Sequence, residues 1–167
     1  MFTEHTLETA PPASRRLMEA TAKQLGHVPP AMARLAESPE MLSGFLKATG
    51  IFDQTTLDPI AREVVVMTIA TRNGCHVCIG LHSQTLAALD ADPALVTALR
   101  EQKPLDDERL EAIRTFTLRL LASAGAVDDD ELAAFTAAGY TPRNALEVVL
   151  GIGTYTMSTF ANRLVRA

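Results

Sequence analysis

Cysteine is scarce in this chain of 167 residues, because Cys75 and Cys78 are the only two. They lie three positions apart, so a disulfide between them would close a very short loop and would add little stability. A pair at this spacing can arise by chance in a cysteine-rich chain, but seldom in a chain with two cysteines. The scarcity therefore argues against a structural disulfide and favours thiol chemistry at this one position.

The sequence also lacks a basic patch and a long apolar run. The net charge is −5 and the pI is about 5.3, so nothing is suited to neutralise phosphates and no nucleic acid partner is expected. No uncharged stretch reaches the ~18 apolar residues of a membrane-spanning helix, and the N-terminus does not resemble a signal peptide. We expect no membrane partner and a cytoplasmic location. In that reducing compartment a close cysteine pair more often cycles between thiol and disulfide, or binds a metal.

Low-complexity segments are absent as well. With 47% hydrophobic and 21% charged residues, the composition is that of an ordinary globular protein and argues against long disordered tails. A chain of this length fits one domain, since domains commonly have roughly 100–200 residues. We therefore expect a single domain over residues 1–167 with one compact core.

Apolar and polar residues do not alternate with a period of two over any long stretch, and the signals that start and end elements are those of helices. Four prolines follow an oxygen-bearing side chain, as in an N-cap before the first helical residue; the pairs are Ser38-Pro39, Asp58-Pro59, Asp92-Pro93 and Thr141-Pro142. Asp128 and Glu131 add an acidic capping box. Apolar residues recur at helical spacing between these starts. The sequence predicts an all-α chain with helices over 12–26, 30–51, 58–73, 76–90, 92–101, 106–124, 128–137 and 142–164.

The expected helix over 58–73 is apolar on most faces, which is typical of a central helix in a bundle or of an oligomer interface. Glu63 lies one turn into it. A buried carboxylate must be paired, hydrogen-bonded or protonated, because an isolated buried charge is too costly. A purely structural explanation is also available, since the dipole of the helix favours a negative charge near its N-terminus.

The last helix contains two glycines, Gly151 and Gly153. Glycine costs about 1 kcal/mol relative to alanine in a helix interior, so its use here indicates close approach of another backbone or side chain. Tight helix packing or a subunit contact would explain both glycines, and a substrate channel is a less favoured alternative.

The two thiols are expected at the start of a helix. Gly74 can end the helix over 58–73, so that the next helix begins near Cys75, where unpaired backbone N–H groups and the helix dipole stabilise a thiolate. In Cys-x-x-Cys pairs such placement can lower the thiol pKa well below its usual value of about 8.5. Cys78, one turn later, points to the same side and can reach Cys75 to form a disulfide.

His82 follows Cys78 by four residues, so the two share one face of the expected helix. Neutral imidazole can accept a thiol proton near physiological pH. Glu63 is the candidate carboxylate to orient this imidazole and to stabilise its cation. A helix histidine is nevertheless more often a solvated or hydrogen-bonded bystander, and His76, on another face, is a weaker signal still.

Metal binding is an alternative use of the same residues. Cys75, Cys78 and His82 would supply three ligands for zinc, with water or Glu63 as the fourth. Structural zinc sites usually draw their second pair of ligands from another knuckle, which this chain lacks. We therefore expect no metal and no other cofactor.

The segment from Glu63 to His82 resembles the active-site signature of the alkylhydroperoxidase AhpD-like proteins, within the carboxymuconolactone decarboxylase superfamily. In that family a helix glutamate precedes a Cys-x-x-Cys by twelve residues and a histidine follows the second cysteine by four, as Glu63, Cys75, Cys78 and His82 do here. The all-helical pattern and the Asn162-Arg163-Leu164 ending of the last helix are also similar. The resemblance implies an AhpD-like multi-helix bundle that assembles as a homo-oligomer, a trimer or a hexamer.

The resemblance further implies a thiol-dependent peroxidase that acts on hydroperoxides. One thiolate attacks the peroxide and becomes a sulfenic acid, and the other cysteine resolves it to a disulfide. Glu63 and His82 would relay the proton of Cys78, and a dithiol partner, a lipoylated carrier or a thioredoxin-like protein, would reduce the disulfide. Alternatives are a redox sensor or disulfide reductase with the same thiols, and a decarboxylase acting on lactones, which the cysteine pair disfavours.

The order in which the two thiols act is ambiguous from spacing. Exposure at a helix start favours Cys75 as the thiol that meets peroxide, whereas proximity to His82 favours Cys78. We predict that Cys78 attacks and Cys75 resolves. Val77 is a departure from the resemblance, because well-known relatives carry a histidine there and valine cannot relay protons; His76 is displaced by about 100° around the helix.

Overall fold

The computed structural model describes residues 2–167, which form nine α-helices and no strand. The prediction of an all-α chain is confirmed. In chain order the helices are α1 (Pro12–Leu25), α2 (Pro30–Leu35), α3 (Pro39–Phe52), α4 (Pro59–Arg72), α5 (His76–Ala88), α6 (Pro93–Arg100), α7 (Glu108–Ser123), α8 (Asp129–Ala137) and α9 (Pro142–Leu164). Within the part of the chain described here, no helix is both long and apolar enough to cross a membrane.

One predicted helix is wrong. We expected a single helix over 30–51, but α2 ends at Leu35 and α3 begins at Pro39. Pro39 has no backbone N–H to continue a helix, and it holds Ser38 in extended backbone with φ −115° and ψ 104°. The Ser38 hydroxyl then accepts a hydrogen bond from Met41 N at 3.2 Å. The Ser38-Pro39 pair therefore starts a helix, as its N-cap pattern predicts, and the error lies in the continuous range over 30–51.

The other expected helix starts are confirmed. The side chains of Asp58, Asp92, Asp128 and Thr141 each accept a hydrogen bond from a backbone N–H in the first turn of α4, α6, α8 and α9. These bonds satisfy donors that a helix start leaves without an intrahelical partner. Local sequence alone therefore sets where these four helices begin.

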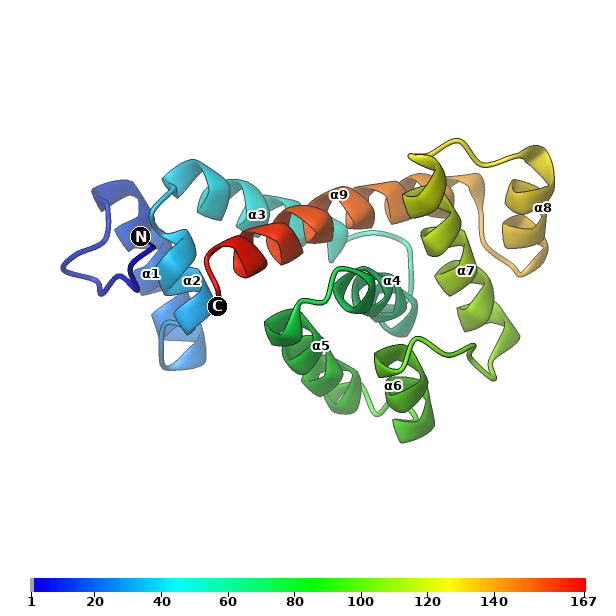
Figure 1. Cartoon of the computed structure of the whole chain (residues 1–167), viewed down its shortest axis with the longest axis horizontal. Coiled ribbons are helices and arrows are strands. Elements are labelled where there is room, and N and C mark those ends of the chain that lie inside the picture. The colour runs from blue at the N-terminus through cyan, green and yellow to red at the C-terminus, as the bar shows by residue number, and fades with distance from the viewer. Residues whose placement is uncertain (1) are drawn as a thin grey trace.

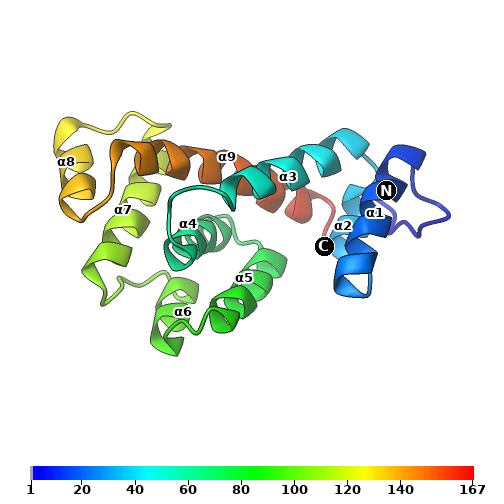
Figure 2. The same ribbon diagram turned by 180° about the vertical axis from the view of Figure 1, so that it is seen from behind.

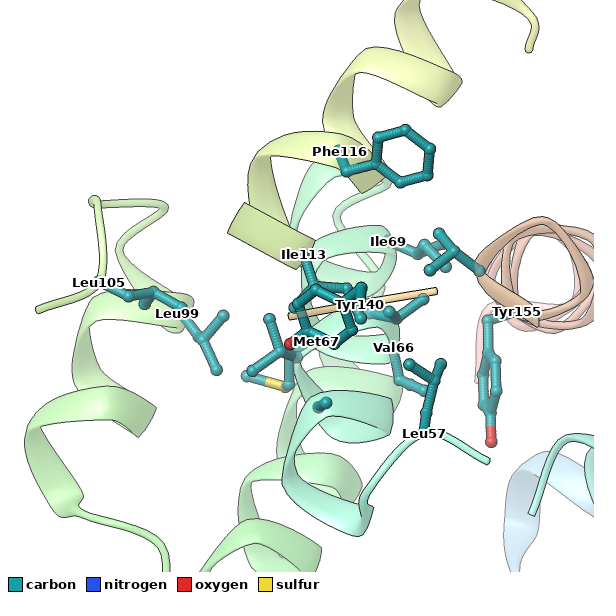
Figure 3. Close-up of a cluster of buried hydrophobic side chains, with 14 of the residues drawn as sticks. Leu57, Val66, Met67, Ile69, Leu99, Leu105, Ile113, Phe116, Tyr140 and Tyr155 are labelled. Carbon is teal, nitrogen blue, oxygen red and sulfur yellow. The ribbon is translucent and has the colours of Figure 1, made fainter. Parts of the chain in front are cut away.

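α4 is the central helix, as its apolar faces predict, and it packs against α5, α6, α7 and α9. Its buried residues Val64, Val65, Val66, Met67 and Ile69 are each at most 1% exposed. Figure 3 shows the side chains around it, including Leu99, Leu105, Ile113, Phe116 and Tyr155. Glu63 and the start of α5 are thus anchored to the most deeply buried element of the fold.

α9 runs along the molecule from α7 and α8 at one end to α1 and α2 at the other, in Figure 1 and, from behind, in Figure 2. Its 23 residues extend beyond the helices that surround α4. The C-terminal turn reaches a second cluster of buried side chains, which contains Ala10, Met18, Ala33, Leu35, Ala36, Leu42 and Val165. The buried residues therefore form separate clusters instead of the one compact core that we expected.

Gly151 gives α9 its close contact with α3 and α4. A Cβ at this position would lie 2.8 Å from a ring carbon of Phe52 and 3.1 Å from a methyl of Val65, and both of these side chains are fully buried. At Gly153, which faces solvent, a Cβ would meet nothing within 4 Å. Tight helix packing thus accounts for Gly151 but not for Gly153.

We expect the Gly151→Ala substitution to lower the free energy of unfolding by about 1–3 kcal/mol, because the added methyl overpacks a rigid aromatic contact. The matched Gly153→Ala substitution should raise stability by up to ~1 kcal/mol through helix propensity. Chemical denaturation of both variants measures the difference, and equal stabilities would contradict this account of Gly151.

Candidate active site

The turn between α4 and α5 places Cys75 and Cys78 next to each other. Gly74 adopts φ +64°, which glycine tolerates without strain. The N–H of Gly74 donates to Thr71 O at 3.1 Å and the N–H of Cys75 donates to Ala70 O at 3.0 Å, which is the pattern of a Schellman motif. α4 therefore ends at this turn, as predicted, and Cys75 becomes the N-cap residue of α5.

Cys75 and Cys78 are free thiols that pack together against Ala70 in the interior. The thiol of Cys78, which can donate its proton toward Cys75 Sγ, outweighs the cost of burial and lowers the pKa of Cys75 to about 6. The same proton sharing, together with burial, raises the pKa of Cys78 above its ordinary range. Of the two thiols, Cys75 is therefore the one whose surroundings favour the thiolate.

α9 supplies polar groups to the thiols that sequence reasoning did not identify. Asn162 is buried, and its Nδ2 donates to Cys78 Sγ at 3.4 Å. Arg163 donates to the backbone carbonyl of Asn73, and its charge contributes to the lowered pKa of Cys75. Both residues belong to the ending of the last helix that resembles the family, but they follow the thiols by more than eighty positions, so no local motif could show that they contact them.

Glu63 and His82 are hydrogen-bonded to each other. Nδ1 of His82 lies 2.8 Å from Oε2 of Glu63, and each side chain is 13% exposed. Because the carboxylate accepts at Nδ1, the other ring nitrogen is left as the proton acceptor in neutral imidazole. The buried Glu63 carboxylate is therefore paired, and α4 and α5 are joined by this bond.

Tyr155 from α9 packs on the same imidazole. Its ring meets the His82 ring edge to face, with centroids 5.3 Å apart. Burial and the nearby charge of Glu63 raise the pKa of Tyr155, so its hydroxyl stays protonated. Tyr155 thus fixes the plane of His82 without competing for its proton.

His82 and Cys78 occupy one side of α5, but the residues described here show no direct hydrogen bond between them. The side-chain donor that reaches Cys78 Sγ is Asn162. The direct form of the expected His82–Cys78 contact is therefore absent, and a connection through one water stays a prediction.

The remaining candidates lie outside this arrangement. His76 is exposed on α5, and Val77 is about one-third exposed. Among residues 2–167, no group of three or more His, Cys, Asp or Glu side chains is arranged to hold a metal ion.

The thiol pair should titrate in two widely separated steps. We expect one thiolate to appear with a midpoint near pH 6, measured by thiolate absorbance, and the second thiol to stay protonated through neutral pH. The Cys78→Ala substitution should move the Cys75 midpoint upward, because the largest cause of its lowered pKa is removed. Since folding lowers the pKa of Cys75, its contribution to stability is full above the unfolded value of about 8.5 and is lost as pH falls through about 6. Titration of both thiols together near their ordinary value would contradict this assignment.

Comparison with known proteins gives matches at the level of structure. Neither the protein-family models nor the curated proteins match this chain. An uncharacterized peroxidase-related protein from Ralstonia eutropha JMP134, described as an alkylhydroperoxidase AhpD core, matches with a TM-score of 0.85 at 18% identity, over 98% of this chain and 88% of that one. A peroxidase-related protein from Silicibacter sp. TM1040 gives 0.80 at 20% identity, over 99% and 90%.

A third solved structure is a cysteine-to-alanine variant of the debrominase Bmp8 in complex with 2,3,4-tribromopyrrole, with a TM-score of 0.71 at 16% identity over 93% of this chain and 84% of that one. At these identities the likeness concerns the fold. The resemblance inferred from Glu63, Cys75, Cys78 and His82 is confirmed at that level. This all-helical chain has an AhpD-like fold.

Proposed function

We propose that this protein is a thiol-dependent peroxidase that reduces hydroperoxides with Cys75, Cys78, His82 and Glu63. The observation that carries the proposal is a buried pair of free thiols, one with a lowered pKa, one helical turn from the hydrogen-bonded Glu63–His82 pair. Strongly shifted thiol pKa values beside a general base are typical of sites that use a thiolate as nucleophile.

Cys75 is the thiol that attacks. The thiolate is the reactive form, and the proton of the pair rests on Cys78. This order is the reverse of the one that spacing to His82 favours. Cys75 Sγ bonds to one peroxide oxygen as the O–O bond breaks, the leaving oxygen takes a proton to become an alcohol or water, and Cys75 is oxidised to the sulfenic acid.

Cys78 then resolves the sulfenic acid. Its proton passes to His82, through one water, and Glu63 stabilises the resulting imidazolium. Cys78 Sγ bonds to Cys75 Sγ, and the sulfenic oxygen leaves as water once it is protonated. A dithiol protein, a lipoylated carrier or a thioredoxin-like protein, supplies the two electrons that restore both thiols.

Sustained turnover is the test of this proposal. Purified protein with a hydroperoxide and a dithiol reductant should consume peroxide through many cycles. A redox sensor with the same thiols would consume one equivalent for each thiol pair and stop, and that result would overturn the peroxidase proposal in favour of the sensor. A screen of lipoylated and thioredoxin-like reductants would identify the partner.

The Bmp8 likeness motivates a second candidate function. Bmp8 is a debrominase, and its structure holds a brominated pyrrole. A nearby pair of thiols can supply the two electrons that replace bromine by hydrogen. Bromide release from 2,3,4-tribromopyrrole, measured beside peroxide consumption with the same dithiol, separates the two activities.

We also propose that the protein is a homo-oligomer, with the outer face of α9 as the contact. Exposed apolar side chains recur there at helical spacing, at Leu146, Val149, Phe160 and Leu164, with exposures from 48% to 73%. Exposed apolar side chains aligned along one helix in this way are typical of an association surface. Sedimentation of the purified chain as a trimer or hexamer supports this proposal, and a stable monomer overturns it.

A further inference from the structure

Two polar side chains of α9, Asn162 and Ser158, lower the pKa of Cys78 by hydrogen bonds, and Asn162 has the larger effect. It lies in the last turn of α9, is 6% exposed, and donates through Nδ2 to Cys78 Sγ. A hydrogen bond from this donor stabilises a neutral thiol only weakly, because its sulfur is a weak acceptor. A thiolate gains much more, since a hydrogen bond to an ionised acceptor is roughly twice as strong as one between neutral groups.

The other end of the same amide has no partner. Oδ1 of Asn162 is buried and accepts no hydrogen bond from any residue among 2–167. Buried polar atoms are nearly always satisfied, so an orphaned carbonyl oxygen beside reactive sulfurs calls for an explanation. A donor that exists only during the reaction would satisfy it, and a sulfenic acid is such a donor because it carries an O–H.

The position of Asn162 is held on both sides. One turn earlier on α9, the hydroxyl of Thr159 accepts from Asn73 Nδ2 at 2.9 Å. The next residue, Arg163, donates to the backbone carbonyl of Asn73. Asn73 precedes the turn that carries Cys75. The two bonds therefore hold the end of α9 against this turn and keep the Asn162 amide next to Cys78 Sγ.

We propose that Asn162 is a further catalytic residue: Nδ2 stabilises Cys78 Sγ as that sulfur loses its proton, and Oδ1 accepts the O–H of the sulfenic acid on Cys75. The role of Oδ1 rests on the proposed peroxidase chemistry, whereas the role of Nδ2 requires only the thiol pair. Neither role consumes Asn162, and the electron balance of the two steps is unchanged.

The test compares Asn162→Ala and Asn162→Asp with Asn144→Ala. Asn144 lies on the same helix, is 7% exposed, and bonds to Thr56 and Glu147 far from the thiols. Two readouts are needed: thiolate absorbance against pH without peroxide, and the rate at which one equivalent of hydroperoxide converts the protein to the disulfide, with a sulfenic acid trap in parallel.

We expect Asn162→Ala to raise the midpoints of both thiols, the first by about one pH unit, because Asn162 lowers the pKa of Cys75 as well as that of Cys78 and a donor to the charged form is lost. Disulfide formation should slow roughly tenfold or more, with trapped sulfenic acid increasing. Asn162→Asp should raise the midpoint further, because it adds a like charge. Asn144→Ala should leave both readouts unchanged even where it lowers the melting temperature.

Unchanged readouts in Asn162→Ala, or the same changes in Asn144→Ala, would overturn the proposal. If wild-type protein is not oxidised by hydroperoxide at all, the peroxidase proposal and the role of Oδ1 fall together. The absorbance midpoints then still decide the role of Nδ2, so the two failures are distinguishable.

Discussion

Replacement of either Cys75 or Cys78 by serine is expected to abolish peroxide turnover supported by a dithiol. Serine keeps the size of the side chain, but its hydroxyl cannot form a disulfide, so the catalytic cycle cannot close. Loss below detection is expected for both variants, because no other cysteine exists in the chain to substitute. Peroxide consumption under steady-state conditions makes the measurement, and retained turnover in either variant would refute the two-thiol mechanism.

A single turnover distinguishes the roles of the two sulfurs. Cys78→Ser should still react once, giving a sulfenic acid on Cys75 that a trapping reagent captures. Cys75→Ser should react far more slowly, because burial still raises the pKa of Cys78 after the hydrogen bond with the Cys75 thiol, the larger cause of the shift, is removed. Trapping in Cys75→Ser alone would reverse the order of attack and restore the one that spacing to His82 favours. Circular dichroism of both variants verifies that the fold is intact.

Helix positions could be predicted because short-range chemistry sets them. An N-cap oxygen before proline needs only neighbouring residues, and Asp58, Asp92 and Thr141 behave as expected. Ser38 also behaves as expected, so the error is the range 30–51, which runs across a helix start that the sequence itself marks. Apolar residues on both sides of Ser38-Pro39 suggest one continuous helix, and the local stop signal is the stronger of the two.

Sequence spacing predicts site residues that lie near one another in the sequence, but it does not predict contacts between residues of distant helices. The spacing from Glu63 to His82 indicates four residues of one site, and the turn at Gly74 follows from glycine's tolerance of positive φ. The contacts of Tyr155 and Asn162 could not be predicted, because they depend on how α9 crosses α4 and α5. A seam of small and apolar residues in α9 indicates packing but does not specify which polar side chain will meet a sulfur.

The same reasoning explains the order of the thiols. Sequence spacing measures distance along α5 and therefore pairs Cys78 with His82. The pKa of a thiol depends instead on every donor around it, including groups on other helices. The hydrogen bond from Cys78 is the largest cause of the lowered pKa of Cys75, and Asn162 and Arg163 of α9 lower it further. The effect of these α9 residues on the pKa of Cys75 cannot be predicted until the packing of the helices is known.

Glu63→Gln is expected to lower the rate of peroxide turnover by roughly 10²-fold, in line with the contribution of a positioned proton-transfer group. Glutamine keeps the shape and can still hydrogen-bond to His82 Nδ1, but it cannot stabilise the imidazolium that forms when the proton of Cys78 is taken up. Because Glu63 acts through His82, it is a positioning residue. Its loss should therefore shift the pH dependence of turnover as well as its magnitude.

His76→Ala is the matched control for Glu63→Gln, because His76 lies on α5 beside the thiols in sequence yet is exposed. It should leave both the rate and the pH profile unchanged. His82→Phe completes the set: an aromatic ring preserves the edge-to-face contact with Tyr155 but removes the proton acceptor. A similar loss of turnover in His82→Phe and Glu63→Gln, with no further loss in the double variant, would show that the two residues act as one unit. Additive losses would mean that Glu63 acts on the thiols by a route independent of His82.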